Sequence, residues 1–415
     1  LGDVYKRQGD ETPMIVENRH SRAHFDKTLT ALVFALAIFG VIAVSVATYT
    51  TSSSSDAPLL NHIVESTYSM RQFVFLMLAP FVVAFIYNIP YDWLRRRATL
   101  IYYGGTALLV IVLFASQASG VRAWMDIIWG FTIQPSEFAK LSMILMLARV
   151  LSRYDKPMST VRDFIYIMAL VLVPGLIIML QGEMGSLLVI IFLFAVMLYF
   201  SNVDWKVLLG LALAAVILIL TVYGLAVASG SDNYRLQRIL AFFDPEAYSS
   251  SDAYQQTQSK IAIGSGGLNG IGAFVDGSYA QLDYVPADWT DFIFASIGEA
   301  FGFRGCMIIL TFYLLIILRM IYLARYTRDK FGSLVIAGVM GMLLFHVFEN
   351  IGMTTGLMPI TGIPLPFLSY GGSNMVTNMG GVALVLNVTK NRSLSHTIIT
   401  PQTESNPYRF SGRIM

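Results

Sequence analysis

The sequence predicts an all-α polytopic membrane protein with ten membrane-spanning helices. Of the 415 residues, 55% are hydrophobic and only 13% are charged, whereas a soluble domain carries about 25% charged residues. The mean hydropathy is +0.63, and the apolar residues form long uncharged runs typical of membrane spans. This composition argues against a soluble enzyme and a disordered chain. A net charge of only +2 does not favour a nucleic-acid partner.

Ten apolar segments follow one another along the chain, and helices are expected because lipid-exposed single strands cannot satisfy their backbone hydrogen bonds. Eight segments are uncharged runs, and the fourth and eighth carry charge at their starts. In order, the predicted spans are 29–50, 73–89, 99–117, 136–148, 164–180, 184–200, 207–229, 291–318, 331–348 and 375–389.

These spans form one membrane domain, 29–389, between an N-terminal tail at 14–28 and a C-terminal tail at 390–415. Residues 1–13 precede the first methionine and contain no apolar core. They are therefore expected to be a non-native or disordered prefix rather than a signal peptide.

The basic residues predict the orientation of the spans. If the N-terminus is cytoplasmic, twenty-one of the 28 lysines and arginines fall on the cytoplasmic side, five fall outside and two lie within spans. Both termini are therefore predicted to be cytoplasmic. A large extracellular loop then remains at 230–290, and long loops in compact proteins are usually functional. Another outer loop, 118–135, contains Trp124 and Trp129 and is expected to form an interfacial helix.

A carboxylate and a lysine occur together at the start of the fourth span, in the sequence QPSEFAK (134–140). Glu137 and Lys140 are three residues apart, so they share a helix face and can pair. Ser136 is a candidate N-cap. Ionisable residues within a membrane are costly and are functional candidates by default. The pair either pins this short span or contacts a substrate.

A second set of carboxylates lies where the large loop meets the eighth span, in PADWTDFIFASIGE (286–299). Asp291 at this boundary can be partly desolvated, which would raise its basicity toward that of a general base. The alternative role is a helix cap, because a helix N-terminus stabilises the anion. Glu299 lies about 12 Å deeper along the helix axis and is expected to be a structural partner.

The large loop also carries YQQTQSK (254–260) and the glycine-rich stretch IGSGGLNGIG (263–272). Glycine-rich backbone can bind phosphate, and Lys260 could contact a pyrophosphate, whereas a tight turn is the alternative. The pattern G-x-x-x-x-G-K-S/T is absent and the segment faces outward, so an ATP site is not expected. Cys306 is expected to be a buried thiol, and the scattered histidines show no metal-binding spacing.

A proline- and glycine-rich region, 350–373, separates the last two spans. Its three prolines prevent a continuous helix, so its backbone must be buried in protein or line a wet cavity. Just before it, His346 and Glu349 are three residues apart and could pair within the ninth span.

These motifs, in this order, resemble the SEDS family (shape, elongation, division and sporulation), which includes RodA, FtsW and SpoVE. The resemblance covers nearly all of 26–387 and rests on QPSEFAK, YQQTQSKIAIGSGGL, TDFIFASIGE and GMTTGLMPITGIPLPFLSYGGS. The wording TGIPLPFLSYGG is closer to RodA, the rod-shape member, than to FtsW. The sequence departs from the family pattern at two places. The family motif Q-P-D-L-G-T reads QGEMGS (181–186), so its acidic residue is Glu183. A second glutamate that often follows Glu299 in the family is replaced by Ala300.

The resemblance implies a peptidoglycan glycosyltransferase of the bacterial cytoplasmic membrane, which polymerises lipid II on the outer face for cell elongation and rod shape. It also implies undecaprenyl-pyrophosphate-linked glycan as a ligand. The implied partners are a class B penicillin-binding protein, which crosslinks the product, and further membrane proteins of the elongation complex. The family's catalytic aspartate falls on Asp291. The expected substrate-binding residues are Arg122, Glu137, Lys140, Lys260 and Ser369, and the expected supporting residues are Glu183 and Glu299.

For this reaction, an α-linked donor and a β-1,4-linked product indicate one direct displacement with inversion. Asp291 would take the proton from the acceptor hydroxyl as that hydroxyl attacks. The leaving pyrophosphate needs positive charge, supplied by Arg122, Lys140, Lys260 or a divalent cation such as Mg²⁺ or Mn²⁺. The alternatives are a lipid II flippase, a scaffold for the penicillin-binding protein, and the division or sporulation paralogue of the polymerase.

Overall fold

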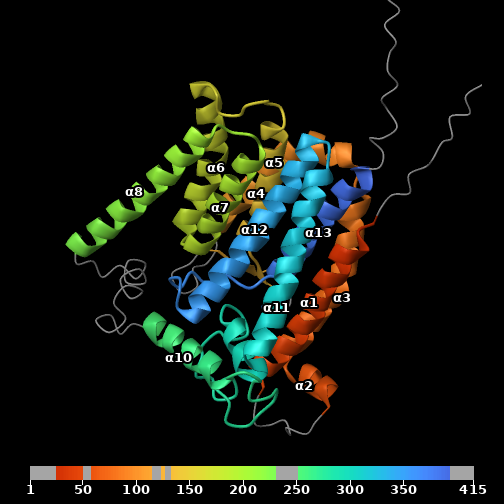
Figure 1. Ribbon diagram of the computed structural model, residues 1–415, viewed down its shortest axis with the longest axis vertical. Helices are drawn as coiled ribbons and strands as arrows, with labels where there is room; N and C mark the ends of the chain where they lie inside the picture. The colour runs from red at the N-terminus through yellow and green to blue at the C-terminus, as the bar shows by residue number, and fades with distance from the viewer. Residues whose placement is uncertain (1–24, 50–57, 115–122, 127–131, 230–250, 393–415) are drawn as a thin grey trace, which may run out of the picture.

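The computed structural model describes residues 25–49, 58–114, 123–126, 132–229 and 251–392 (Figure 1). This part of the chain consists of helices and one short two-stranded ladder. The elements are α1 (Lys27–Ala47), α2 (Leu59–Glu65), α3 (Thr67–Asn88), α4 (Tyr91–Val112), β1 (Met125–Asp126), β2 (Thr132–Ile133), α5 (Pro135–Leu151), α6 (Val161–Gln181), α7 (Met184–Phe200), α8 (Trp205–Ser229), α10 (Ser251–Ser265), α11 (Ile293–Tyr326), α12 (Lys330–Thr355) and α13 (Gly372–Arg392). The predicted prefix at 1–13 and most of both tails lie outside the described residues.

Each of the ten predicted spans falls on one long helix: α1, α3, α4, α5, α6, α7, α8, α11, α12 and α13. Among the described helices, five are long and apolar enough to cross a membrane by themselves: α1, α3, α6, α11 and α12. The 17 residues of α5 measure only about 26 Å, which is shorter than the ~30 Å hydrocarbon core of a bilayer. The all-α membrane fold is therefore confirmed, and the number of crossings stays a prediction.

Helix α12 lies in the middle of the bundle (Figure 1) and contacts α5, α7, α11 and α13. Most of its residues are apolar, and 78% of its most apolar stretch is buried, as expected for a helix surrounded by other helices. Gly338 permits the closest approach: a Cβ there would lie 2.7 Å from Ile144 of α5 and 2.9 Å from Met197 of α7. This close packing fixes the polar residues of α12 against α5.

The start of α1 and the end of α13 lie at the same end of the bundle. Asn387 of α13 donates hydrogen bonds to three carbonyl groups at the end of α3, those of Ile86, Tyr87 and Ile89. The ring of Phe25, just before α1, lies 5.5 Å from that of Tyr87. The shared end agrees with an even number of spans, while the assignment of this end to the cytoplasm stays a prediction.

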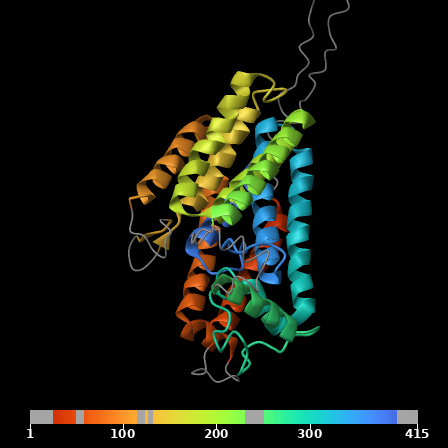
Figure 2. The same cartoon turned by 90° about the vertical axis from the view of Figure 1, so that its left-hand side faces the viewer.

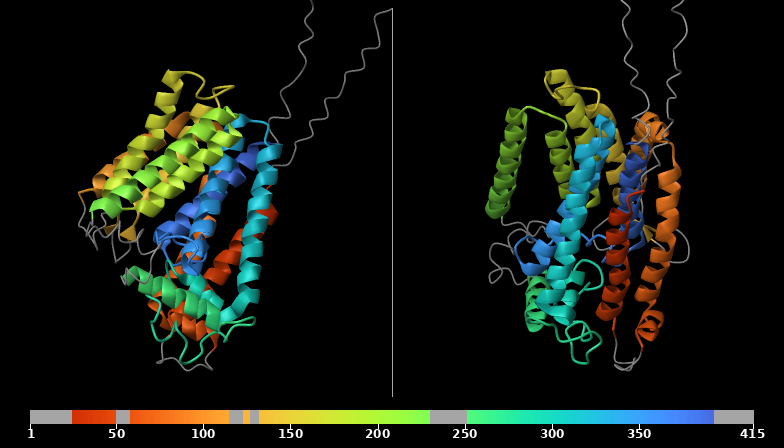
Figure 3. Two further views of the ribbon diagram at one scale, coloured as in Figure 1. Left: turned by 60° about the vertical axis from the view of Figure 1, so that its left-hand side comes forward. Right: turned by 45° about the vertical axis from the view of Figure 1, so that its right-hand side comes forward.

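The opposite end of the bundle carries α2, α10 and residues 266–292 (Figures 1 and 2). Helix α11, with 34 residues, connects this end to the other (Figure 3). Helix α8 lies at the edge of the bundle beside α7 (Figure 1). The described part of the large loop, 251–290, is therefore gathered around the start of α11.

Two local expectations are wrong. No interfacial helix forms in the described part of 118–135; instead β1 and β2 pair antiparallel, with Met125 opposite Ile133. The N-cap of α5 is Gln134 rather than Ser136, because Pro135 occupies the first helical position. Proline favours that position, since its fixed φ suits a helix and its missing N–H would have no partner there.

Candidate functional site

Asp291 lies immediately before α11, whose N-cap is Phe292. Its backbone carbonyl accepts a 2.7 Å hydrogen bond from the Asn350 amide, which also donates to the carbonyl of Ile363 at 2.7 Å. Its carboxylate faces Gly362, where an added Cβ would lie 3.3 Å from Asp291 Oδ2. The residue is partly exposed. Asn350 thus fixes the Asp291 backbone to the proline- and glycine-rich residues 356–371 between α12 and α13, here called the broken segment.

Ser369 holds the residue before Asp291 in place. Its hydroxyl donates to the carbonyl of Thr290 at 2.6 Å and accepts from the amide of Leu365 at 2.7 Å. Next to it, the amide of Tyr370 donates to the carbonyl of Trp289 at 2.9 Å. Ser369 is fully buried, so these contacts give it a positioning role, and its expected contact with substrate stays a prediction.

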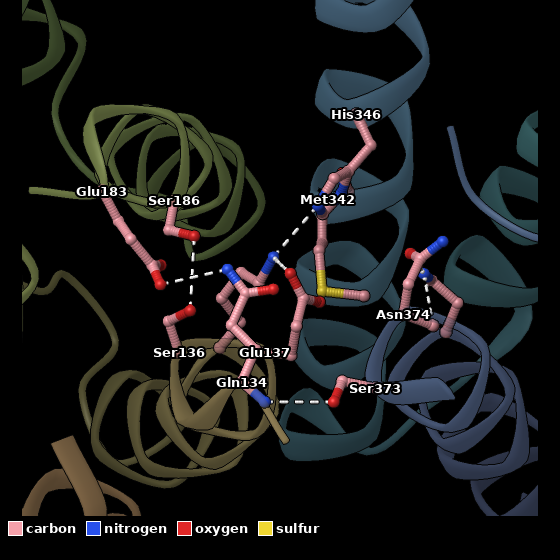
Figure 4. A network of polar contacts seen from close by, with 11 residues as sticks. Gln134, Ser136, Glu137, Glu183, Ser186, Met342, His346, Ser373 and Asn374 are labelled. Atoms are coloured by element: carbon pink, nitrogen blue, oxygen red, sulfur yellow. Dashed lines mark hydrogen bonds and ion pairs between the residues drawn. The ribbon is translucent and has the colours of Figure 1, made fainter. Parts of the chain in front are cut away.

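Glu137 and Lys140 form an ion pair of 2.7 Å in the interior, with side chains 2% and 1% exposed (Figure 4). A third residue completes this cluster: Lys140 Nζ also lies 3.0 Å from Nε2 of His346 on α12. Because an ammonium can only donate, the Lys140 ammonium donates to Nε2. The ring proton is therefore on Nδ1, which donates to the Met342 carbonyl at 2.7 Å. His346 is therefore neutral, and the cluster contains one positive and one negative charge.

His346 and Glu349 do not pair, although their spacing suggested it. His346 contacts Lys140 and Met342, whereas Glu349 accepts a 2.8 Å hydrogen bond from Thr361 of the broken segment. Both side chains are fully buried. The helices and loop packed around α12 offer better partners than its own next turn does, so the local prediction was wrong.

Gln134 connects three elements of the site (Figure 4). Its side-chain amide donates to Glu183 Oε1 at 3.0 Å, and its backbone amide donates to the Ser373 hydroxyl at 3.1 Å. Glu183 thus joins the start of α7 to the start of α5. Burial raises the pKa of the Glu183 carboxyl, with hydrogen bonds from Ser136 and Gln134 partly offsetting the effect. The contacts are those of a supporting residue.

The broken segment contacts Asp291, Glu349 of α12 and the start of α7. Gly362 faces Asp291, and Thr361 donates to Glu349. On its other side, Gly185 of α7 approaches so closely that a Cβ would lie 2.9 Å from the Thr361 carbonyl. Several buried polar atoms around it have no hydrogen-bond partner among the described residues. They include one oxygen each of Glu137, Glu183, Glu349 and Asn350. Because buried polar groups normally have partners, this interior is suited to polar groups of a ligand or to water.

The motif YQQTQSK serves to dock α10 on the end of α12. The Gln256 amide donates to the carbonyls of Met353 and Met358, at 3.1 and 3.0 Å, and Ser259 donates to the Thr354 carbonyl at 2.8 Å. These bonds satisfy carbonyl groups that a helix C-terminus leaves without partners. The Lys260 side chain lies over Gly356, the C-cap of α12. Its contact with substrate stays a prediction.

The glycine-rich stretch contains turns at 266–269, and the amides of Gly267, Gly270, Ile271 and Gly272 donate to backbone carbonyls rather than to a phosphate. It inserts beside a break in α11 at Gly302, whose φ is 64° and ψ −167°. The amides of Ile271 and Gly272 donate to the carbonyls of Glu299 and Ala300, and the carbonyl of Gly267 accepts from Phe303. A Cβ at Gly270 would lie 2.1 Å from the Ala300 oxygen. Glycine is required here because two backbones touch.

Two further carboxylates stabilise the loop around this break. Glu299, 2% exposed, accepts from the amides of Tyr279 and Ala280 at 2.7 and 3.2 Å. Asp288, 1% exposed, accepts from the Ser296 hydroxyl at 3.1 Å. Burial raises the pKa of the Asp288 carboxyl well above its ordinary value. Glu299 thus makes structural contacts, and Asp288 ties the loop to the first turn of α11.

The expected roles of Arg122 and of a divalent cation both stay predictions. Arg122 lies outside the described residues. Within those residues, no three His, Cys, Asp or Glu side chains come together as metal ligands. A divalent cation therefore stays an expectation from the reaction chemistry.

Sequence reasoning missed three residues that organise the site: Asn350, His346 as the partner of Lys140, and Gln134. Gln134 begins the motif QPSEFAK, and Asn350 begins the proline- and glycine-rich region. A polar residue at membrane depth is itself a signal of a functional site. The contact between His346 and Lys140 carries no signal in a single sequence, because the two residues are 206 positions apart.

Comparison with known proteins identifies the family. The model of the Cell cycle protein family of FtsW, RodA and SpoVE matches residues 26–394. The chain is 30% identical over 375 residues to the peptidoglycan glycosyltransferase MrdB of Escherichia coli K12, covering 90% of this chain and 95% of that protein. It is 35% identical over 330 residues to stage V sporulation protein E of Bacillus subtilis, covering 78% and 87%.

The fold agrees with solved structures of the same kind. A chain from a peptidoglycan synthase complex that coordinates polymerization and crosslinking matches with a TM-score of 0.73 at 28% identity, covering 89% of this chain and 98% of that one. The rod shape determining protein RodA of Thermus thermophilus matches with a TM-score of 0.64 at 27% identity, covering 89% and 97%. The chain therefore belongs to the FtsW, RodA and SpoVE family and is an integral membrane protein.

Proposed function

We propose that this protein is a peptidoglycan glycosyltransferase that polymerises lipid II into β-1,4-linked glycan at the outer face of the bacterial cytoplasmic membrane. Relatives named peptidoglycan glycosyltransferase cover almost the whole chain. One observation carries the assignment of the site. Asp291 is partly exposed, its carboxylate faces Gly362, and its backbone is fixed by Asn350.

In this proposal, Asp291 accepts the proton of the acceptor 4-hydroxyl while that oxygen attacks the anomeric carbon of the donor sugar. The bond to the undecaprenyl pyrophosphate breaks on the opposite face, so the configuration inverts and no covalent enzyme intermediate forms. A general base contributes about 10²- to 10⁴-fold to such a step. The bonds from Asn350 and Ser369 hold the 290–291 backbone, which keeps the base aligned with the acceptor.

The buried Glu137–Lys140–His346 cluster supplies a fixed positive charge in a low-dielectric interior, balanced by one carboxylate. Such preorganised charge stabilises a developing anion more than it would in water. A direct contact between Lys140 and the leaving pyrophosphate requires the ammonium to exchange one of its present partners. A divalent cation, when bound, would neutralise charge on the pyrophosphate, but no three described His, Cys, Asp or Glu side chains come together to hold it.

We further propose a class B penicillin-binding protein as partner, because the related synthase complex couples polymerization to crosslinking. Relatives named MrdB, RodA, FtsW and stage V sporulation protein E all match. The motif wording and the RodA structural neighbours favour a role in elongation over one in division or sporulation.

The proposal is tested by polymerisation of labelled lipid II. The purified protein is assayed with its co-purified penicillin-binding partner, whose transpeptidase is inactivated, and products are separated by length. Wild type should form polymer, and Asp291→Asn should lower the rate about 10²- to 10⁴-fold with expression and partner binding retained. Asp155→Asn, which changes an exposed carboxylate outside the site, is the matched control and should polymerise normally.

Each contrary outcome has a distinct meaning. Equal rates for wild type and Asp291→Asn would remove Asp291 from the mechanism. No polymer from an intact wild-type complex would contradict the glycosyltransferase. Transport of labelled lipid II across proteoliposomes by the same protein would then identify a flippase, and no transport would favour a scaffold.

A further inference from the structure

A cavity of about 650 Å³ lies at the end of the bundle that carries α2 and α10. It is lined by residues from the end of α1, from α2, from the start of α3 and from the loop at 280–289. Four of its lining residues, Glu65, Thr67, Tyr68 and Asp283, are exposed, so it opens at the surface. Its volume is within the range of small-ligand sites, about 300–1,000 Å³. Of its lining residues, Trp289 also contributes a backbone contact to the Asp291 site.

The lining chemistry narrows the class of ligand. The described residues that line the cavity include the carboxylates of Glu65 and Asp283, the amide of Gln281 and several hydroxyls, but no lysine or arginine. A pyrophosphate would be repelled by this charge. The lining has only two alanines as aliphatic residues, which is unsuitable for a lipid tail. Acceptors and donors of this kind suit a neutral molecule with many hydroxyl groups.

Aromatic rings form one wall of the cavity. Tyr68 and Trp289 stack with their centroids 5.1 Å apart and 24° between planes, and Tyr68 is still 39% exposed. Tyr49 also lines the space. Aromatic side chains offer a flat apolar surface together with a polar edge, which matches a sugar ring with an apolar face and peripheral hydroxyls. Aromatic faces beside carboxylates and amides therefore favour a saccharide.

The cavity adjoins the proposed base. Trp289 is two residues before Asp291, and its carbonyl accepts from the Tyr370 amide in the same set of contacts that includes Ser369. The Tyr68 ring also lies 5.2 Å from that of Tyr370. A sugar chain with one end at Asp291 can therefore continue along the Trp289–Tyr68 wall.

We propose that this cavity is a saccharide-binding subsite, which holds uncharged sugar rings of the glycan strand next to the ring that reacts at Asp291. The assignment rests on the proposed function, because that function supplies the glycan. Holding the strand between additions would favour repeated extension of one chain over its release.

Direct binding tests the subsite without any turnover. The probe is a soluble tetrasaccharide of N-acetylglucosamine, which carries no charge, titrated calorimetrically into the purified full chain. Tyr68→Ala should raise Kd about tenfold through loss of the stacking surface. Asp283→Asn, which keeps the shape of the side chain, should raise it about threefold through a weaker hydrogen bond. Tyr254→Ala, an exposed tyrosine on α10 outside the cavity, is the control and should bind as wild type.

Melting temperatures show whether each variant is folded, and Asp283→Asn keeps the test valid if Tyr68→Ala unfolds. The proposal is overturned if wild type does not bind the tetrasaccharide at millimolar concentration, or if the cavity variants bind as tightly as the Tyr254 control. A failure of the proposed function is separate. Wild type would then make no polymer from lipid II, whatever the outcome of the tetrasaccharide titration.

Discussion

The region around Asp291 and the cluster around Lys140 hold their charges by different means. Asp291 precedes its helix and is partly exposed; Asn350 fixes its backbone, and its carboxylate faces a glycine. Lys140 lies inside α5, is 1% exposed, and contacts the side chains of Glu137 and His346. In the first region hydrogen bonds fix the main chain, and the residue that carries the reactive group is partly exposed. In the second the charged group itself is enclosed.

This difference in environment predicts that substitutions at the two sites affect different properties, the reaction rate at Asp291 and the stability of the fold at Lys140. A base must reach its substrate, so substitution at Asp291 should affect rate much more than stability. A buried ion pair is neutral overall, but removal of one partner leaves an uncompensated charge. Substitution at Lys140 should therefore affect stability first. The following experiments test this separation, from the largest expected effect to the smallest.

Lys140→Met should lower the free energy of unfolding by about 3–5 kcal/mol, because Glu137 becomes an unpaired buried carboxylate. Denaturant unfolding in detergent, followed by tryptophan fluorescence, measures the change. The double variant Glu137→Gln with Lys140→Met removes both charges and should recover most of the loss. If the double variant is as unstable as the single one, packing rather than charge explains the cluster.

Gly270→Ala should destabilise the Asp291 region through the break in α11. An added Cβ would lie 2.1 Å from the Ala300 oxygen, and φ is +81°. Gly277 has the same φ of +81° with nothing within 4 Å of its Cβ position, so Gly277→Ala isolates the cost of the backbone conformation. Gly270→Ala should cost about 1–3 kcal/mol more than Gly277→Ala, and polymerisation should fall with it. Equal melting temperatures would show that the two backbones separate easily.

Asn350→Ala should moderately lower both the free energy of unfolding and the polymerisation rate. It removes the bonds to the carbonyls of Asp291 and Ile363, each worth about 1 kcal/mol, and it frees the backbone that carries the base. The polymerisation rate should fall about tenfold or more at saturating lipid II. Asn88→Ala, which removes an exposed amide bond at the other end of the bundle, should leave the rate unchanged. A stability loss without a rate loss would restrict Asn350 to a structural role.

Asp288→Asn should change the pH dependence of stability by the smallest amount. Burial raises the pKa of the Asp288 carboxyl well above its ordinary value of 3.8. The folded state therefore binds this proton more tightly than the unfolded chain, and the stability it contributes is lost as pH rises above about 4. Asparagine does not titrate, so the variant should match wild type near pH 4 and become relatively more stable toward pH 8. A pH-independent difference between the two melting curves would contradict this account.

The sequence alone predicted the helices well, because long apolar runs need no tertiary information to be recognised. It also suggested the pairing of Glu137 with Lys140, which depends only on helix periodicity. It failed where partners are distant in the chain. The His346–Glu349 pair was wrong because α12 is enclosed by other elements. For the glycine stretch the turn was foreseen, but its docking on a break in a helix some thirty residues later was not.

The contact between Lys140 and His346 also has a consequence for biogenesis. A lysine near the middle of a helix opposes membrane insertion by about 3 kcal/mol, and α5 carries one together with Glu137. His346 is synthesised 206 residues after Lys140, which takes about 10–40 s at usual rates of translation. During that time α5 must stay in the membrane, either at the translocon or beside earlier helices. Its Lys140 ammonium then lacks the contact with His346. The period before α12 is inserted is therefore when the nascent chain most needs protection from degradation.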